Sequence, residues 1–238
     1  MITEINTHHH TGISVGVLFI IATVFLFVGG AFYGPVLDAP NFLETTYPHR
    51  INVIIGILIE FSCIIAIPLI PVFAFPVLRK HNEKLAIAYI IFRLFAAVIF
   101  LFVDVTKLSL IKVSELYLVA SDAVTAETFV NIASVIQAWN EWVWIFYVLI
   151  FAVSALIFYI LLYRSKLLPR WISIWGIIAI VLMASGAFLD MFDAGLPDAV
   201  YGLMAVPIAV QEMVMAVRLI GKGFNPITKT NATEKEVA

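Results

Sequence analysis

The sequence predicts an all-α membrane protein: one polytopic bundle of six transmembrane helices with both termini in the cytoplasm. Two observations predict this class. Of the 238 residues, 63% are hydrophobic and only 13% are charged, whereas a soluble domain carries about 25% charged residues. The apolar residues also form long unbroken runs rather than alternating with polar ones, which argues against the strands of a membrane barrel. We therefore expect most of the surface to face lipid.

Six runs are long enough to cross the hydrocarbon core of a bilayer, which takes about 20 mostly apolar residues of helix. In chain order they cover residues 13–34, 51–78, 84–105, 141–163, 170–191 and 200–220. The N-terminus lacks the basic first region of a signal peptide, so we expect the first run to be retained as a helix. Together the runs predict a single domain over residues 1–238, ending in a flexible cytoplasmic tail at 224–238.

The connection between the third and fourth runs, residues 106–140, is long enough to hold structure of its own. Apolar side chains recur there at helical spacing between residues 125 and 139. They are Phe129, Ile132, Val135, Ile136 and Trp139. This spacing predicts an amphipathic helix that lies on the membrane surface or extends the fourth helix.

The orientation follows from the basic residues outside the runs, because cytoplasmic loops carry an excess of Lys and Arg. Nine lie on one side of the predicted membrane and three on the other. The nine are Arg79, Lys80, Lys84, Arg164, Lys166, Arg170, Lys222, Lys229 and Lys235, and the three are Arg50, Lys107 and Lys112. The side with nine holds both termini and is predicted to be cytoplasmic, in the cell membrane.

Three ionisable residues lie inside the runs at one depth. Glu60 and Arg93 each stand nine residues from the start of their run, and Glu212 stands nine residues before Gly221, which places each about 14 Å into the bilayer at a rise of ~1.5 Å per residue. An unpaired charge at that depth costs roughly 2.5–3.5 kcal/mol. We therefore predict that they meet in one cluster, with Arg93 as its only cation. Asn52 shares a polar face of its helix with Glu60, and Gln211 is a further candidate member of the cluster.

The predicted cluster has two interpretations. It is either a structural ion-pair network that fixes the order of the helices, or a site for a small molecule, lipid, ion or proton. One cation facing two carboxylates leaves a net negative charge, so a proton, a cation or a hydrogen-bond donor would complete the group.

A second acidic group is predicted at the outer ends of the helices. It comprises Asp104, Glu141, Asp190 and Asp193. These carboxylates either gather cations at an outer mouth or are solvated ends of helices.

Within the first run, Gly30 and Gly34 form a small-xxx-small pair of the kind that lets membrane helices pack closely.

Several classes of function find no support in the sequence. No run offers a histidine for haem, and none holds a lysine near its middle for a retinal Schiff base. The net charge of −2 argues against nucleic-acid binding, and the single cysteine, Cys63, leaves the redox compartment open. No nucleophile, metal or phosphate motif is present. We expect no catalytic residues, no metal site and no cofactor.

Three stretches carry a resemblance to a known family. They read FPVLRKHNEKLAIAYIIFR at 75–93, YRSKLLPRWISIWG at 163–176, and PIAVQEMVMAVRLIGKGFNP at 207–226. They resemble the prokaryotic membrane family catalogued as domain of unknown function DUF4386. The resemblance covers most of the chain and includes Arg93 and Glu212. It implies a six-helix membrane protein and assigns no reaction, ligand or partner.

The leading functional hypothesis is a membrane module without catalysis that binds or moves a small polar or amphipathic ligand, an ion or a proton at the charged cluster. One alternative is a structural or signalling subunit whose partner is another membrane protein or a second copy of the chain. Another is an integral membrane enzyme that acts on lipid. In each case the lipid bilayer is a contact of the protein.

Overall fold

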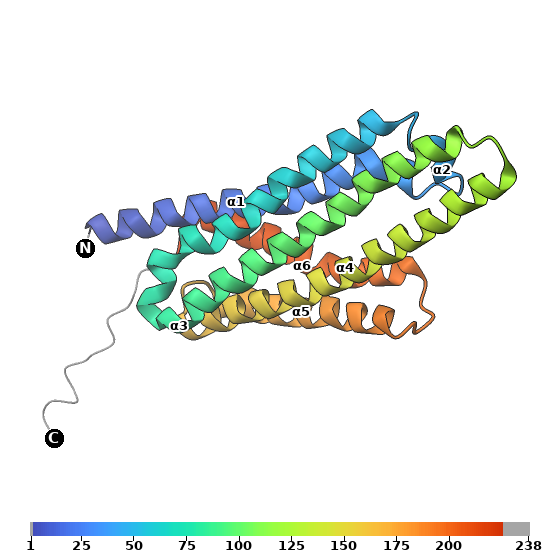
Figure 1. Ribbon diagram of the computed structural model, residues 1–238. Helices are drawn as coiled ribbons and strands as arrows, with labels where there is room; N and C mark the ends of the chain where they lie inside the picture. Colours follow the sequence, from blue (N-terminus) through green and yellow to red (C-terminus); the bar gives the residue numbers. More distant parts are fainter. Residues whose placement is uncertain (1, 226–238) are drawn as a thin grey trace, which may run out of the picture.

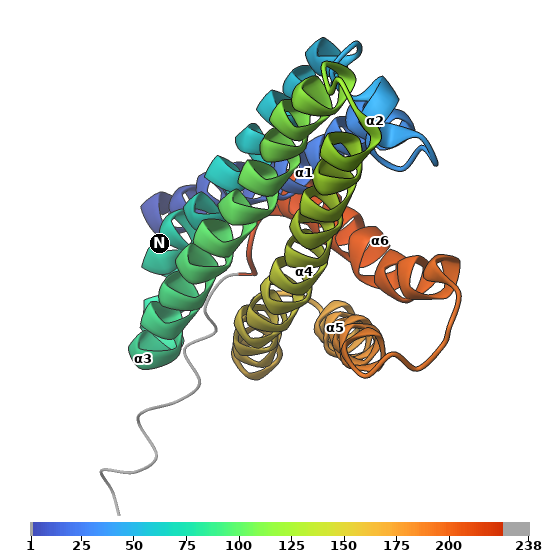
Figure 2. The ribbon, with the colours of Figure 1, turned by 45° about the vertical axis from the view of Figure 1, so that its right-hand side comes forward.

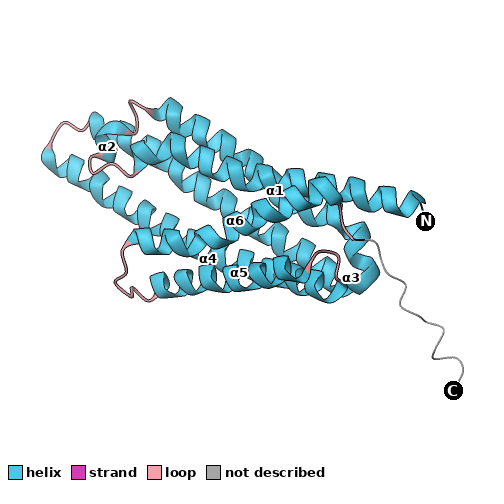
Figure 3. Cartoon of the chain, turned by 180° about the vertical axis from the view of Figure 1, so that it is seen from behind, coloured by secondary structure: helices cyan, strands magenta, loops and turns pink. Residues whose placement is uncertain are grey.

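The computed structural model describes the chain from residue 2 to residue 225, and within this part it is all-α, as predicted (Figure 3). The helices are α1 (Ile2–Leu37), α2 (Phe42–Thr45), α3 (Arg50–Leu118), α4 (Ala123–Ser165), α5 (Arg170–Met191) and α6 (Asp198–Lys222). Five of them, all except the short α2, are long and apolar enough to cross a membrane. The second and third predicted runs both lie in α3.

The helix α3 folds back on itself at Asn82, where φ of −160° and ψ of 102° break the helical conformation. The Asn82 side chain accepts a hydrogen bond from the backbone N–H of Leu85 at 3.0 Å, which caps the second half of the helix. Figure 1 shows the two limbs, residues 50–81 and 83–118, running in opposite directions. A straight helix of 69 residues would measure about 104 Å, more than three times the roughly 30 Å hydrocarbon core. The bend therefore divides α3 into two limbs, each of which contains one predicted run.

The long connection predicted at 106–140 is almost entirely helical. The second limb of α3 continues to Leu118, and α4 begins at Ala123 after a turn of four residues. Asp122 caps α4 by accepting hydrogen bonds from the backbone N–H and the hydroxyl of Thr125. With 43 residues, α4 is about 65 Å long, so it and its α3 partner extend beyond the span of a bilayer.

The part of α4 before the fourth predicted run, residues 123–140, is called its extended part. It packs on the bundle through Phe129, Ala133 and Ile136. The other apolar residues of the predicted amphipathic face, Ile132, Val135 and Trp139, are exposed. The face of α4 that contacts the bundle is thus narrower than the predicted apolar face. It is centred on the buried Ala133.

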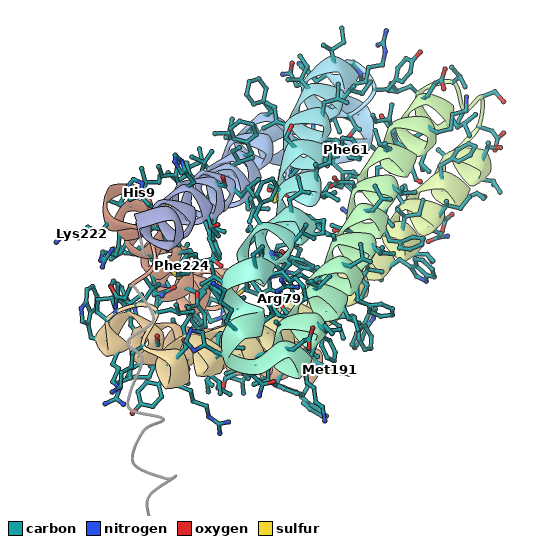
Figure 4. All side chains as sticks on the ribbon, turned by 90° about the vertical axis from the view of Figure 1, so that its left-hand side faces the viewer. His9, Phe61, Arg79, Met191, Lys222 and Phe224 are labelled. Carbon is teal, nitrogen blue, oxygen red and sulfur yellow. The ribbon has the colours of Figure 1, made fainter. Side chains whose placement is uncertain are left out.

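Glycines allow α1 to pack closely against α6. A Cβ atom at Gly12 would lie 2.6 Å from the Cα of Gly223, and one at Gly16 would lie 2.7 Å from the carbonyl oxygen of Ala216. These contacts press the start of α1 against the end of α6. As a result His9 and Lys222 lie at the same end of the bundle (Figure 4).

The surface of the bundle is apolar along most of its length. Large side chains such as Leu58, Ile178, Leu203 and Val217 are more than half exposed. The interior is a continuous apolar core that includes the stacked rings of Tyr89 and Phe158, whose centroids are 4.7 Å apart. Exposed apolar surface of this extent fits lipid and not water.

The first two residues of the predicted tail pack against the bundle. Phe224 is buried in the main core, and the backbone N–H of Asn225 donates to the carbonyl oxygen of Leu167 at 2.8 Å. The Asn225 side chain also accepts a hydrogen bond from Arg218. Residues 226–238 of the predicted tail lie outside the described residues.

Candidate functional site: two buried charge groups and a cavity

Arg93 and Glu212 face each other inside the bundle, with Arg93 Nη2 at 3.7 Å from Glu212 Oε1. Both are buried. Thr23 of α1 donates to Glu212 Oε2 at 3.1 Å, and the guanidinium lies 4.4 Å from the ring centroid of Phe151. Arg93 Nε and Glu212 Oε1 are buried and have no hydrogen-bond partner among the described residues. The structure therefore brings together two of the three charges that the sequence placed at one depth.

Glu60, the third, does not join them. Its partner is Lys107, whose Nζ lies 2.6 Å from Glu60 Oε2 and 3.1 Å from Asp104 Oδ1. Lys107 has a side chain only 9% exposed, although the sequence assigned it to an outer connection. Arg93 is consequently not the only buried cation, and the predicted single cluster is two separate groups.

Tyr33 of α1 completes the second group. Its hydroxyl donates to Glu60 Oε1 at 2.7 Å and accepts from Lys107 Nζ at 2.9 Å. The close approach of α1 to α3 makes this possible, because a Cβ at Gly29 would lie 2.7 Å from the carbonyl oxygen of Gly56. We call Tyr33, Glu60, Asp104 and Lys107 the lysine group, and Thr23, Arg93 and Glu212 the arginine group.

The two polar residues expected beside the predicted cluster lie elsewhere. Gln211 is buried, but it accepts a hydrogen bond from the hydroxyl of Tyr159 at 2.6 Å and donates to the carbonyl oxygen of Ile172 at 3.0 Å. Gln211 thus ties α6 to α4 and α5. Asn52 is exposed on α3.

The four residues of the predicted outer acidic mouth do not gather. Asp104 is buried in the lysine group, whereas Glu141, Asp190 and Asp193 are exposed. Asp190 lines a cavity of about 270 Å³ together with Tyr201 and Gly186. No group of three or more residues able to hold a metal ion is found among the described residues.

A larger cavity of about 420 Å³ lies between α1 and α6 and reaches both charge groups. Thr23, Arg93 and Glu212 of the arginine group form part of its wall, and so does Tyr33 of the lysine group. The rest is mainly apolar and aromatic, with Phe19, Leu26, Phe27, Trp144, Tyr147 and Phe151 among its members. Trp144, Met183, Gly202 and Ala205 line both this cavity and the smaller one.

The large cavity reaches the outer surface of the bundle. Phe27 of α1 and Val206 of α6 belong to its wall and are 61% and 47% exposed. The crossing at Gly12 and Gly16 holds α1 and α6 together at one end, and from there the helices diverge (Figure 2). The divergence leaves the space that the cavity occupies.

The fold and its apolar surface define a multi-pass helical membrane protein with charged residues buried in its interior. Comparison with the models of known protein families shows the family to which the chain belongs. The model of the family described as domain of unknown function DUF4386 matches residues 14–223, from α1 to the residue after α6, and the chain belongs to this family. No curated protein and no solved structure matches the chain.

Proposed function

We propose that the protein crosses the cell membrane six times with both termini cytoplasmic, and that it binds a small amphipathic molecule in the large cavity. The two limbs of α3 supply two of the crossings. The orientation is supported by the exposed basic residues. The bend of α3 and the ends of α4 and α6, which carry Arg79, Arg164 and Lys222, lie at the end of the bundle where α1 begins (Figure 1). The start of α3 and the end of its second limb, which carry Arg50 and Lys112, lie at the other end. The burial of Lys107 strengthens this bias, since it removes one cation from the sparse side.

The observation that carries the proposed binding is the unsatisfied polar pair in an apolar wall. A buried arginine offers five N–H donors, and a buried group without a partner is costly. Arg93 Nε and Glu212 Oε1 both lack hydrogen-bond partners among the described residues and belong to residues of the cavity wall. A polar head that accepts from Arg93 and donates to Glu212 would satisfy both, while its apolar body contacts the aromatic wall.

The exposed side of the cavity supports a ligand that comes from the bilayer. Phe27 and Val206 stand on apolar faces of α1 and α6 that would contact lipid. A molecule dissolved in the membrane could pass between these helices without entering water. This route suits an amphipathic molecule better than a hydrophilic one.

A filled cavity gives the direct test. Ala209 lines the cavity, so Ala209→Phe should block it, whereas Val217→Phe on the outer face of the same helix should not. We expect mass spectrometry of the full chain, purified in native membrane discs, to find a small molecule that Val217→Phe retains and that Ala209→Phe and Arg93→Gln lose. Equal amounts in all four proteins would contradict the proposal.

Cys63 offers a second readout, because it is the sequence's single cysteine and lines the same cavity. Lipid extract added to detergent-purified protein should slow its reaction with N-ethylmaleimide. The control is a Cys63→Ala, Phe61→Cys protein, whose thiol would stand on the exposed side of α3 (Figure 4). An equal effect on both thiols would count against binding in the cavity.

A structural or signalling subunit is the second candidate function. The extended part of α4 exposes Ile132, Val135 and Trp139, with Trp139 61% exposed. This apolar line would suit contact with another membrane protein or a second copy of the chain. Crosslinking from a cysteine at position 135 in a Cys63→Ala background would reveal such a contact.

A further inference from the structure

The lysine group has an excess of acid over base. Glu60 and Asp104 both contact the ammonium of Lys107, at 2.6 Å and 3.1 Å. No other Lys or Arg of the described chain forms an ion pair with either carboxylate. With both carboxylates ionised, the group would hold one uncompensated negative charge.

That charge would be almost wholly buried. The side chains of Glu60, Asp104 and Lys107 are 1%, 3% and 9% exposed. Among the described residues, the neighbours of the group add no further cation. They are Tyr33 from α1 and Cys63 and Phe100 from α3. From α4 comes the uncharged Asn140, which donates to the carbonyl oxygen of Val103. Asp38, just past α1, also interacts with Lys107, and it is acidic. A buried charge without a partner is strongly disfavoured in such a setting.

The hydrogen bonds indicate which oxygen is free. Both oxygens of Glu60 accept hydrogen bonds, one from Tyr33 and one from Lys107. Asp104 accepts only at Oδ1, from Lys107. Its Oδ2 is buried and has no partner among the described residues. Asp104 Oδ2 is thus the oxygen at which a further group can be held.

We infer that the lysine group is a proton-binding site: at neutral pH it holds one exchangeable proton on the Glu60–Asp104 pair, at Asp104 Oδ2. One proton makes the group neutral, with Lys107 and Glu60 ionised and Asp104 uncharged. Because the ring of Tyr33 lines the large cavity, the site lies directly behind the cavity wall. The inference goes beyond the proposed ligand binding and does not depend on it.

Charge counting makes the site testable by infrared spectroscopy of the full chain in liposomes. A protonated carboxylic acid has its own carbonyl stretch, which shifts in D₂O if the proton exchanges. The wild type should show this band at neutral pH. Glu60→Gln and Asp104→Asn should each lose one acid's absorption, because either change leaves one carboxylate for one ammonium. Lys107→Met should instead gain the absorption of one further protonated acid, because it leaves two carboxylates without an ammonium.

Two controls separate charge from general disruption. Tyr33→Phe removes two hydrogen bonds and no charge, so it should keep the band. Asp190→Asn removes an exposed carboxylate in another cavity and should also keep it. The conservative variants Glu60→Gln and Asp104→Asn preserve side-chain size, and a melting curve verifies that each is folded.

A wild-type spectrum that neither Glu60→Gln nor Asp104→Asn alters would overturn the inference. The band requires no ligand, so the two proposals fail separately. A band that follows the charge count, with an empty cavity in mass spectrometry, would leave the proton site standing and contradict only the proposed ligand binding.

Discussion

Lys107 joins the two limbs of α3: its Nζ lies 2.6 Å from Glu60 Oε2 across the hairpin and 3.1 Å from Asp104 Oδ1 on its own limb. Tyr33 of α1 contacts the same ammonium. One cation therefore links three helical segments. By contrast, the arginine group joins the second limb of α3 to α6 and α1.

Removal of Lys107 should destabilise the protein far more than removal of Lys112. Lys112 pairs with Glu115 at the same 2.6 Å, but its side chain is 66% exposed. Truncation of one partner of a buried ion pair costs about 3–5 kcal/mol, whereas an exposed pair contributes about 0–1 kcal/mol. Lys107→Met and Lys112→Met should differ accordingly in unfolding free energy in detergent. Equal losses would mean that Lys107 is not buried.

The contact between Gly29 and Gly56 should be needed for the lysine group. A Cβ at position 29 would lie 2.7 Å from the carbonyl oxygen of Gly56, which cannot move without shifting α3. Gly29→Ala should therefore lower the melting temperature and weaken the contact of Tyr33 with Glu60. Gly221→Ala is the control, because a Cβ there meets no heavy atom within 4 Å. It should be neutral or stabilising by up to about 1 kcal/mol, since alanine favours helix.

The helices could be predicted from the sequence because lipid-spanning segments leave a strong hydropathy signal. What hydropathy could not predict was where the helices stop. The third run was ended at Val105, where charged residues begin, yet α3 continues to Leu118. Polar residues outside a bilayer are as compatible with helix as with loop, so composition alone does not mark the end.

This early boundary explains why Lys107 was missed. Arg93, Phe100 and Asp104 share one face of the third run at helical spacing, and continuing this face by three residues gives Lys107. The signal was therefore present. The sequence predicts that Arg93 and Glu212 lie at one depth in the bilayer. Depth alone does not show which carboxylate faces Arg93, because that depends on how the helices rotate and cross.

The closely packed glycines were equally hard to choose from the sequence. Gly30 and Gly34 have the spacing of a packing motif, yet Gly30 lines the cavity. The close helix contacts use Gly12, Gly16 and Gly29 instead. Small residues permit close approach on any face, and only the neighbouring helix decides which face is used.

The cap at Asp122 should make the turn between α3 and α4 sensitive to acid. Hydrogen bonds from the backbone and hydroxyl of Thr125 lower the pKa of Asp122. A carboxyl with a lowered pKa stabilises the fold above its ordinary value of about 3.9, and this contribution is lost as the pH falls through the lowered value. Hydrogen exchange in the first turn of α4 should therefore rise at acid pH relative to Asp122→Asn, whose capping does not titrate. The same pH response in both proteins would contradict this role of Asp122.

The separation of the two charge groups is the feature most open to a quantitative test, through double-mutant cycles in unfolding free energy. Residues in contact show coupling energies of about 0.5–3 kcal/mol, whereas independent sites add within about 0.3–0.5 kcal/mol. Arg93 pairs with Glu212, and Glu60 pairs with Lys107. The cycle of Arg93→Gln with Glu212→Gln should therefore show coupling, because each variant leaves the other residue's charge without its partner.

The cycle of Arg93→Gln with Glu60→Gln should be additive, which is where the structure departs from a single three-residue cluster. In a single cluster either carboxylate could replace the other beside Arg93, so Glu60→Gln and Glu212→Gln together would cost more than the sum of the two. In the two-group arrangement the two costs add, because Glu60 serves Lys107 and cannot take over Arg93. Coupling between Arg93 and Glu60 as large as that between Arg93 and Glu212 would show that the groups act as one, and would remove the charge count on which the proton site depends.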